Sequence, residues 1–150
     1  MLEKKGVILK LITGMALKFL VNGIVITIPQ EIYTQIMKYF HLTNISACEA
    51  SSMLYMKEPS WALGVLALPC VDTLGAIIFF YLLQIIGRDD LILKSVFYSM
   101  VVNSLLFQIF GTMVGNPNVI QDTAGNYVFA SSAALAGLFG GIILKKFILK

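Results

Sequence analysis

Long apolar runs alternate with short polar segments along this chain. In the central run, residues 61–87, only Asp72 and Gln84 carry strongly polar side chains. As a helix with a rise of about 1.5 Å per residue, such a run is long enough to cross the roughly 30 Å hydrocarbon core of a bilayer. By the same criterion, the pattern predicts four transmembrane helices, at about residues 6–28, 61–87, 91–114 and 124–144.

The segment between the first two predicted spans has a helical pattern of its own. Pro29 is expected to end the first span, because proline removes a backbone donor and clashes with the preceding turn. In the following stretch, QEIYTQIMKYFHL, apolar residues recur at helical spacing, which predicts an amphipathic helix on the membrane surface or over the ends of the bundle. Ser46 and Glu49 have the spacing of a capping box, which predicts a second short helix. Residues 29–60 are thus predicted to form a short amphipathic, non-membrane helical region.

Composition agrees with a membrane protein. Of the 150 residues, 58% are hydrophobic and 13% are charged, and the mean hydropathy is +0.85. A soluble domain carries about a quarter charged residues. We therefore predict an all-α integral membrane protein, a four-transmembrane-helix bundle that occupies residues 1–150 as a single membrane domain. The lipid bilayer is its expected partner.

Basic residues mark one side of the predicted bundle. They lie before the first span, around the turn between the second and third spans, and after the fourth span, at Lys4, Lys5, Arg88, Lys94, Lys145, Lys146 and Lys150. Because cytoplasmic segments carry an excess of Lys and Arg, we expect both termini in the cytoplasm and residues 29–60 on the other side. The layout resembles that of small bacterial membrane proteins, so the expected location is the bacterial plasma membrane, although no motif assigns the chain to a family.

Each predicted span places a polar side chain at nearly the same depth. Counted from the cytoplasmic boundary, helix rise puts one polar position of each span roughly 20 Å into the bilayer. These positions are Lys18, Asp72, Asn103, and Ser131 with Ser132. Polar groups at that depth normally face the interior of the bundle and bond one another. We therefore predict an intramembrane polar layer in which Lys18 and Asp72 form an ion pair, either to fix helix register or as part of a transported-ion or proton site.

Small residues form two stripes along the last predicted span. They repeat every four residues, as Ser132, Ala136 and Gly140 on one stripe and as Ala133, Gly137 and Gly141 on the other. Such flat stripes let helix backbones approach closely. We expect close packing within the fold, with a homo-oligomer that forms through the same stripes as the alternative.

Residues that usually carry catalysis or bind metals are few. The chain has two cysteines, Cys48 and Cys70, and one histidine, His41, with no Cys-x-x-Cys or Cys/His cluster, so no metal site and no cofactor are predicted. There is no G-x-S-x-G, no H-E-x-x-H and no phosphate-binding glycine loop. The scattered lysines form no basic stripe for a nucleic acid. The chain also lacks the arginine signature of the four-helix eicosanoid and glutathione transferases, the first-span glutamate of small multidrug exporters and the C-x-x-C of quinone-reducing thiol enzymes.

These observations predict a protein that is not an enzyme. We expect a non-enzymatic accessory or scaffold component whose helices bind a membrane-protein partner. The alternative is a small oligomeric transporter or channel that uses a midplane site made by Asp72 and Lys18, because an ionisable residue inside a membrane commonly marks an ion path. A path through so few helices requires an oligomer.

Overall fold

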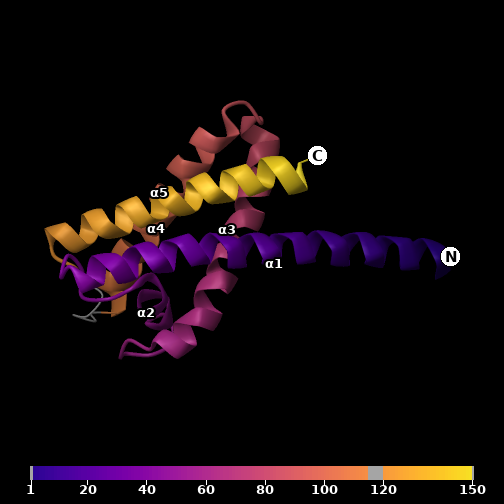
Figure 1. Cartoon of the computed structure of the whole chain (residues 1–150). Helices are drawn as coiled ribbons and strands as arrows, with labels where there is room; N and C mark the ends of the chain where they lie inside the picture. The colour runs from indigo at the N-terminus through magenta and orange to yellow at the C-terminus, as the bar shows by residue number, and fades with distance from the viewer. Residues whose placement is uncertain (1, 115–119, 150) are drawn as a thin grey trace.

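The computed structural model describes the backbone of residues 2–114 and 120–149, and the side chains of residues 14–106 and 120–149. Throughout this part of the chain the regular elements are helices, as the sequence predicted, and no strand is present. Figure 1 shows their arrangement. The elements are α1 (Leu2–Tyr39), α2 (Ala47–Ser52), α3 (Trp61–Ile86), α4 (Leu91–Val114), α5 (Thr123–Ile143) and the π-helical turn η1 (Leu144–Ile148).

Three long helical stretches are apolar enough to cross a membrane. In the described residues they are Gly14–Tyr39, Trp61–Ile86 and Thr123–Ile148, and Leu91–Leu106 of α4 forms a shorter apolar helix. Large apolar side chains on these helices face outward, for example Leu66 at 70% and Ile85 at 84% exposure. In a soluble protein, a surface helix presents charged and polar residues on its outer face instead. The all-helical fold is therefore compatible with a membrane helical bundle.

The sequence predicted that the first long helix ends at Pro29. In the structure, α1 instead continues through Pro29 to Tyr39. The amphipathic helix expected after Pro29 is therefore the last part of α1 rather than a separate element. Contacts outside α1 hold this part in place, since Thr34 Oγ1 accepts the Ala47 N–H at 2.9 Å. The helix ends instead just before His41, whose φ of 58° is the left-handed conformation common after a helix C-terminus.

Glu31 ties this last part of α1 to both α2 and α3. One carboxylate oxygen accepts the Cys48 N–H at 2.8 Å, and the other accepts the indole N–H of Trp61 at 2.8 Å. Hydrogen bonds to an ionised acceptor are roughly twice as strong as neutral ones. A single side chain thus joins the end of one long helix to the start of the next.

α2 begins with the capping box that the sequence predicted. The Glu49 N–H donates to Ser46 Oγ at 3.3 Å, and the Ser46 N–H donates to the Glu49 carboxylate at 2.8 Å. The same carboxylate forms an ion pair with Lys38 of α1 at 2.7 Å. On its other side α2 packs against Gly64 of α3, where even a methyl group would overlap the backbone of Cys48. The prediction of a short helix between the first two long helices is confirmed.

Replacing Glu31 with alanine is expected to lower the free energy of unfolding by about 2 kcal/mol, because the buried Cys48 N–H loses its acceptor. The matched control is Gln35→Ala, which removes only an exposed hydrogen bond to the same carboxylate and should cost less than about 0.5 kcal/mol. Thermal unfolding in detergent, followed by circular dichroism, measures both variants. Equal losses would show that the Glu31 carboxylate does not hold α2.

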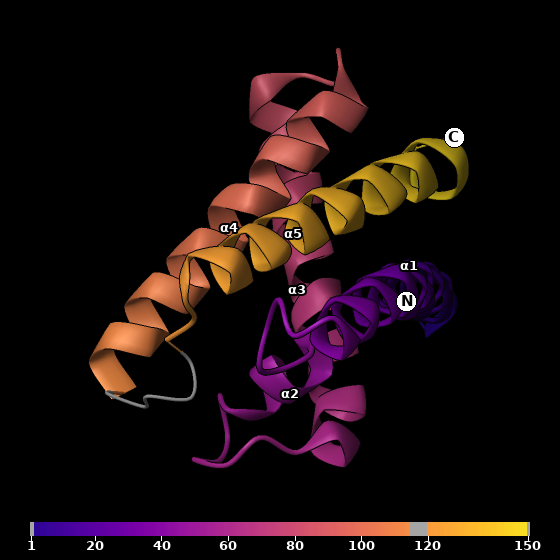
Figure 2. The same cartoon turned by 60° about the vertical axis from the view of Figure 1, so that its left-hand side comes forward.

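The long helices do not share one direction, since α3 runs across α1 (Figures 1 and 2). α4 and α5 pack side by side in antiparallel directions, and α1 packs against α3 and α5 (Figures 1 and 2). α3 and α4 are joined by a short turn but make few other contacts. Lys94 closes this turn, since its Nζ donates to the carbonyl oxygens of Ile86 at 3.0 Å and Gly87 at 3.3 Å. α3 and α4 therefore diverge from their common turn.

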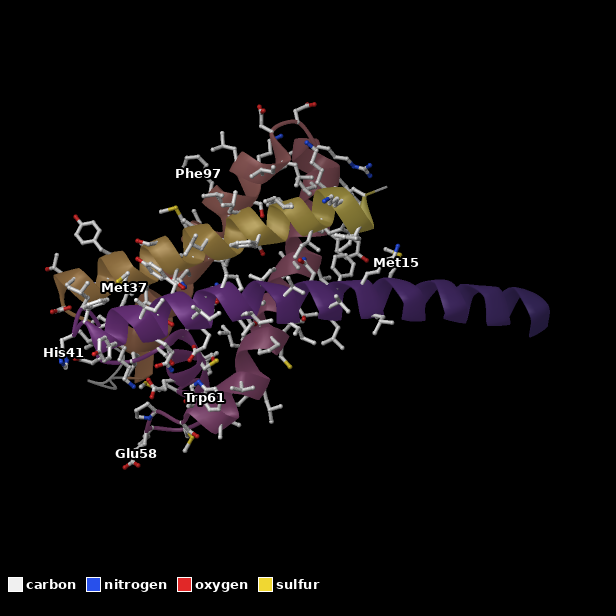
Figure 3. The ribbon with its side chains drawn as sticks, viewed as in Figure 1. Met15, Met37, His41, Glu58, Trp61 and Phe97 are labelled. Atoms are coloured by element: carbon white, nitrogen blue, oxygen red, sulfur yellow. The ribbon has the colours of Figure 1, made fainter. Side chains whose placement is uncertain are left out.

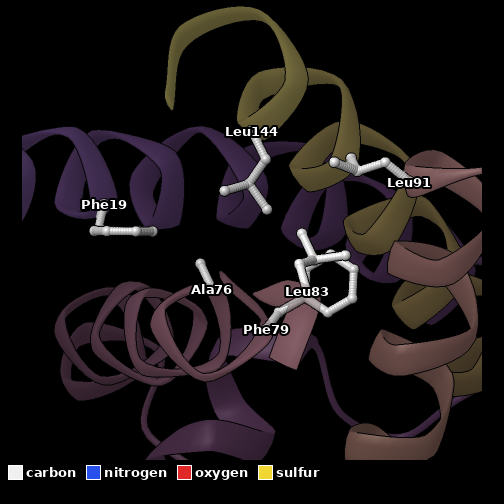
Figure 4. Packing of buried hydrophobic residues seen from close by; sticks show 6 residues of the cluster. All are labelled: Phe19, Ala76, Phe79, Leu83, Leu91 and Leu144. Carbon is white, nitrogen blue, oxygen red and sulfur yellow. The ribbon is translucent and has the colours of Figure 1, made fainter. Parts of the chain in front are cut away.

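A hydrophobic cluster closes the bundle near this turn. It consists of Phe19, Ala76, Phe79, Leu83, Leu91 and Leu144 (Figure 4). The cluster draws residues from α1, α3, α4 and η1, and Phe79, Leu83 and Leu144 are at most 2% exposed. Burial of each such side chain contributes about 1.5–3 kcal/mol. The cluster therefore joins four elements of the fold.

Glycines allow the closest helix contacts. A Cβ added at Gly23 of α1 would lie 2.7 Å from Pro69 O of α3, and one added at Gly137 of α5 would lie 2.6 Å from Ser95 O of α4. Real Cβ atoms do not approach that closely, so only glycine fits at either position. The close contact expected for α5 from its small residues is thus made with another helix of the same chain.

Candidate functional site

A cavity of about 250 Å³ lies at the centre of the bundle and is referred to as the central cavity. Its walls come from all five α-helices and from η1. Along α3 the cavity extends from Leu68, which packs on α2, to Phe79 in the cluster beside η1. The polar side chains of the wall include Asn22, Asp72, Ser95, Ser99, Asn103 and Ser132.

Asp72 is the acidic group of the central cavity. Thr27 of α1 donates its hydroxyl to Asp72 Oδ2 at 2.9 Å. No described residue donates a hydrogen bond to Oδ1, and no described cation forms an ion pair with the carboxylate. α3 therefore presents an acid with one oxygen held by the protein and the other available to a ligand.

Asn22 of α1 is a second unusual group in the wall. Its side chain is 0% exposed, and neither Nδ2 nor Oδ1 has a hydrogen-bond partner among the described residues. Buried amides are almost always hydrogen-bonded, and an unpaired buried polar group costs about 1–3 kcal/mol. Asn22 belongs to the wall of the central cavity, but its donor and its acceptor are covered by protein atoms, so a molecule in that space reaches them only after the side chain turns.

Apart from Asp72, the described residues of the cavity wall carry no charged side chain. The Tyr98 hydroxyl donates to Gly75 O at 3.0 Å and so links α4 to α3, and the Tyr98 ring packs on Phe79 with centroids 4.8 Å apart. Ser95 and Ser132 are almost completely buried. None of the described residues that line the cavity is Lys, Arg or His. The central cavity thus combines one carboxylate with neutral polar groups and a largely apolar surface.

The structure brings three of the predicted polar-layer residues together in the wall of the cavity, namely Asp72, Asn103 and Ser132. Lys18 is exposed and forms no ion pair with Asp72, so the predicted ion pair is wrong. Ser131 is also exposed, and its hydroxyl donates to a carbonyl oxygen of its own helix at 2.6 Å.

Rotation about the axis of α1 explains the position of Lys18. Helix rise sets the depth of a residue, but each residue also turns by about 100° about the axis. The buried face of α1 carries Phe19, Asn22 and Ile26, whereas Lys18 lies off this face. A prediction from depth alone does not include this rotation. Asn22, one turn further along, lines the cavity in the place expected for Lys18.

The sequence prediction missed Asn22, Ser95 and Ser99. Ser95, Ser99 and Asn103 follow one another at intervals of four residues, so they share one face of α4, and all three line the cavity. This polar stripe is a signal that sequence reasoning could have used. A lone asparagine such as Asn22 in an apolar helix gives no comparable signal, because its partners, or their absence, depend on the other helices.

The small residues of α5 divide between the cavity and α4. Ser132, Ala133, Ala136 and Gly140 line the cavity. Gly137 and Gly141 instead lie against α4, around Ser95. Gly137 and Gly141 therefore allow α4 to approach α5 closely, and the other small residues leave room for the cavity.

The described residues offer no obvious catalytic chemistry. They include no group of three or more His, Cys, Asp or Glu side chains that could hold a metal ion. Burial raises the pKa of the Cys48 thiol, and the negative charge of Glu31 raises it further. A raised pKa disfavours the thiolate, which is the reactive form of cysteine. The arrangement is suited to noncovalent binding through one carboxylate and several neutral groups.

Comparisons with known protein families, curated proteins and solved structures find no match to this chain.

Proposed function

We propose that this protein is a membrane-embedded solute-binding protein of the transporter class, with the central cavity as its binding site. The observation that carries the proposal is Asn22, a fully buried amide in the wall of the cavity whose polar atoms have no hydrogen-bond partner in the part of the chain that the structure describes. Transporters bind their substrates near the bilayer midplane, at polar or ionisable side chains that face the interior of the bundle. A solute that bonds to Asn22 would remove the cost of the unpaired amide.

We further propose that α1, α3, α4 and α5 cross the bacterial plasma membrane with both termini in the cytoplasm. Arg88 and Lys145 line one groove, so the α3–α4 turn and the C-terminal end of the chain lie at the same end of the molecule. His41 and Glu58 lie at the opposite end (Figure 3). This arrangement supports the orientation that the positive-inside rule favours.

Cys70 tests the insertion of α3. Its side chain is exposed in the structure and would face lipid if α3 spans the bilayer. In right-side-out vesicles, we expect a membrane-impermeant maleimide to leave Cys70 unmodified and to label Glu58→Cys in the exposed loop before α3. Cys48 is 1% exposed and should not interfere. Mass spectrometry detects the label, and labelling of Cys70 at the rate of Glu58→Cys would contradict the insertion.

Filling the central cavity tests the proposed function. Ala136→Phe would place a ring in the cavity from α5, whereas Ser131→Phe adds the same ring to an exposed position of that helix. We expect fluorine NMR in detergent to detect bound para-fluorobenzylamine or para-fluorobenzyl alcohol with wild type and Ser131→Phe. Ala136→Phe should bind about tenfold more weakly or not at all. Equal binding by all three proteins would contradict a solute site in the cavity.

The accessory role expected from the sequence is the second candidate function. Its support is the apolar surface that α1 exposes, which a partner helix could cover as well as lipid could. This surface includes Leu17, Leu20, Val21, Ile24 and Ile28. Purification in a mild detergent with mass spectrometry of co-eluting proteins tests it. A stoichiometric membrane-protein partner, together with no solute binding, would favour the accessory role.

A further inference from the structure

We infer that the solute of the central cavity is a monovalent organic cation, a protonated amine with an apolar body, that pairs with Asp72. The inference rests on the proposed function, that the cavity binds a solute, and adds the chemical class of that solute. It follows from the charge, the volume and the wall of the cavity.

The carboxylate of Asp72 has no positively charged partner among the described residues of the cavity wall. Asp72 is the acidic side chain among the described residues of the wall, and none of these residues is a cation. A charged residue at the centre of a bilayer costs about 2.5–3.5 kcal/mol on insertion scales, and such residues normally pair. Lys18 does not pair with it, and Thr27 donates to Oδ2 alone. An ammonium group would supply both the missing positive charge and a donor for Oδ1.

A metal ion fits the wall poorly. Calcium and magnesium take about six or more oxygen ligands, usually with carboxylates among them, and the described residues hold no cluster of three acidic, His or Cys side chains. The central cavity has a volume of about 250 Å³, well above the space that a single bound water needs. A bare monovalent ion would occupy a small part of this volume, whereas an organic body would fill it.

The wall suits an organic cation with an apolar body. Phe79, Tyr98 and Phe129 contribute aromatic rings to it, and the rings of Phe79 and Tyr98 lie 4.8 Å apart. An aromatic face attracts a cation within about 6 Å of its centre. Asn22 adds an amide oxygen without a partner among the described residues, which can accept an N–H from a protonated amine once its side chain turns into the cavity. An anion would meet the repulsion of Asp72 instead, so the wall selects against it.

Three probes of similar shape and different charge test the inference: para-fluorobenzylamine, which is protonated at neutral pH, para-fluorobenzyl alcohol and para-fluorobenzoate. Fluorine NMR titrations of the full chain in detergent measure the affinity of each. We expect the amine to bind at least about tenfold more tightly than the alcohol, and the benzoate to bind most weakly.

Two variants separate the contributions of the wall. In Asp72→Asn, where Thr27 can still donate to the new amide oxygen, the amine should lose its advantage over the alcohol. Asn22→Leu should weaken binding of the amine by about tenfold. The control Gln84→Leu, at an exposed position of α3, should leave all affinities unchanged.

The outcomes distinguish the inference from the proposed function. Equal affinities of amine and alcohol in the wild-type protein, both lost in Ala136→Phe, would overturn the cationic class and leave the solute site standing. Absence of binding by every probe, or binding that Ala136→Phe does not change, would overturn both. A preference for the amine that persists in Asp72→Asn would overturn the role of Asp72. If Asp72→Asn does not fold, the ranking of the three probes in the wild-type protein still decides the chemical class.

Discussion

Gly64→Ala is expected to lower the free energy of unfolding by about 3 kcal/mol or more, which would leave little folded protein at moderate temperature. The added methyl group would overlap the carbonyl group of Cys48 in α2, and backbone atoms in a helix cannot move aside as a flexible side chain can. α2 would have to separate from α3. That separation would also break the hydrogen bonds through which Glu31 joins Cys48 and Trp61.

Gly75→Ala is the matched control on the same helix. A Cβ added there meets no atom within 4 Å, so the substitution should be neutral or raise stability by up to about 1 kcal/mol, the difference in helix propensity. Thermal unfolding in detergent measures both variants through the fluorescence of Trp61, the single tryptophan of the chain. Similar Tm values for Gly64→Ala and Gly75→Ala would mean that α2 does not pack on α3 at Gly64.

Asn22→Leu is expected to stabilise the protein in the absence of added solute by about 1–3 kcal/mol, and to weaken or abolish solute binding. Leucine has nearly the shape of asparagine but carries no donor or acceptor. Because the Asn22 amide has no hydrogen-bond partner among the described residues, its replacement breaks no hydrogen bond to any of them. Gain of stability with loss of binding is typical of a polar residue that is kept for function.

Thermal unfolding of Asn22→Leu, with and without para-fluorobenzylamine, measures both effects. Gln84→Leu makes the same kind of change at an exposed position of α3 and should alter stability by no more than about 0.5 kcal/mol. A Tm of Asn22→Leu below that of the wild-type protein would contradict an unpaired amide in the cavity wall.

The extents of three helices could be predicted from the sequence. The spans 61–87, 91–114 and 124–144 agree with α3, α4 and α5 to within one residue at each end. The capping box of α2 could be predicted in the same way, since Ser46 and Glu49 have its spacing in the sequence and form it in the structure. Hydropathy, caps and turn residues act over a few positions of the chain, so they can be read without knowledge of the fold.

The end of the first helix could not be predicted in this way. Proline in a helix interior costs about 3 kcal/mol relative to alanine, which made Pro29 a reasonable end for the span. The helix continues because residues after Pro29 bind other elements, with Thr34 bonded to Ala47 and Glu31 bonded to Cys48. These contacts join residues more than ten positions apart, and no local pattern contains them.

The sequence by itself determined that the protein is helical and how apolar its helices are. Composition and hydropathy are enough for these conclusions. Only the tertiary structure decided which polar groups face one another, because that depends on how each helix is rotated and where it crosses its neighbours. It placed Asn22 rather than Lys18 in the cavity wall with Asp72, and among the described residues neither the Asn22 amide nor Asp72 Oδ1 has a hydrogen-bond donor or acceptor as its partner.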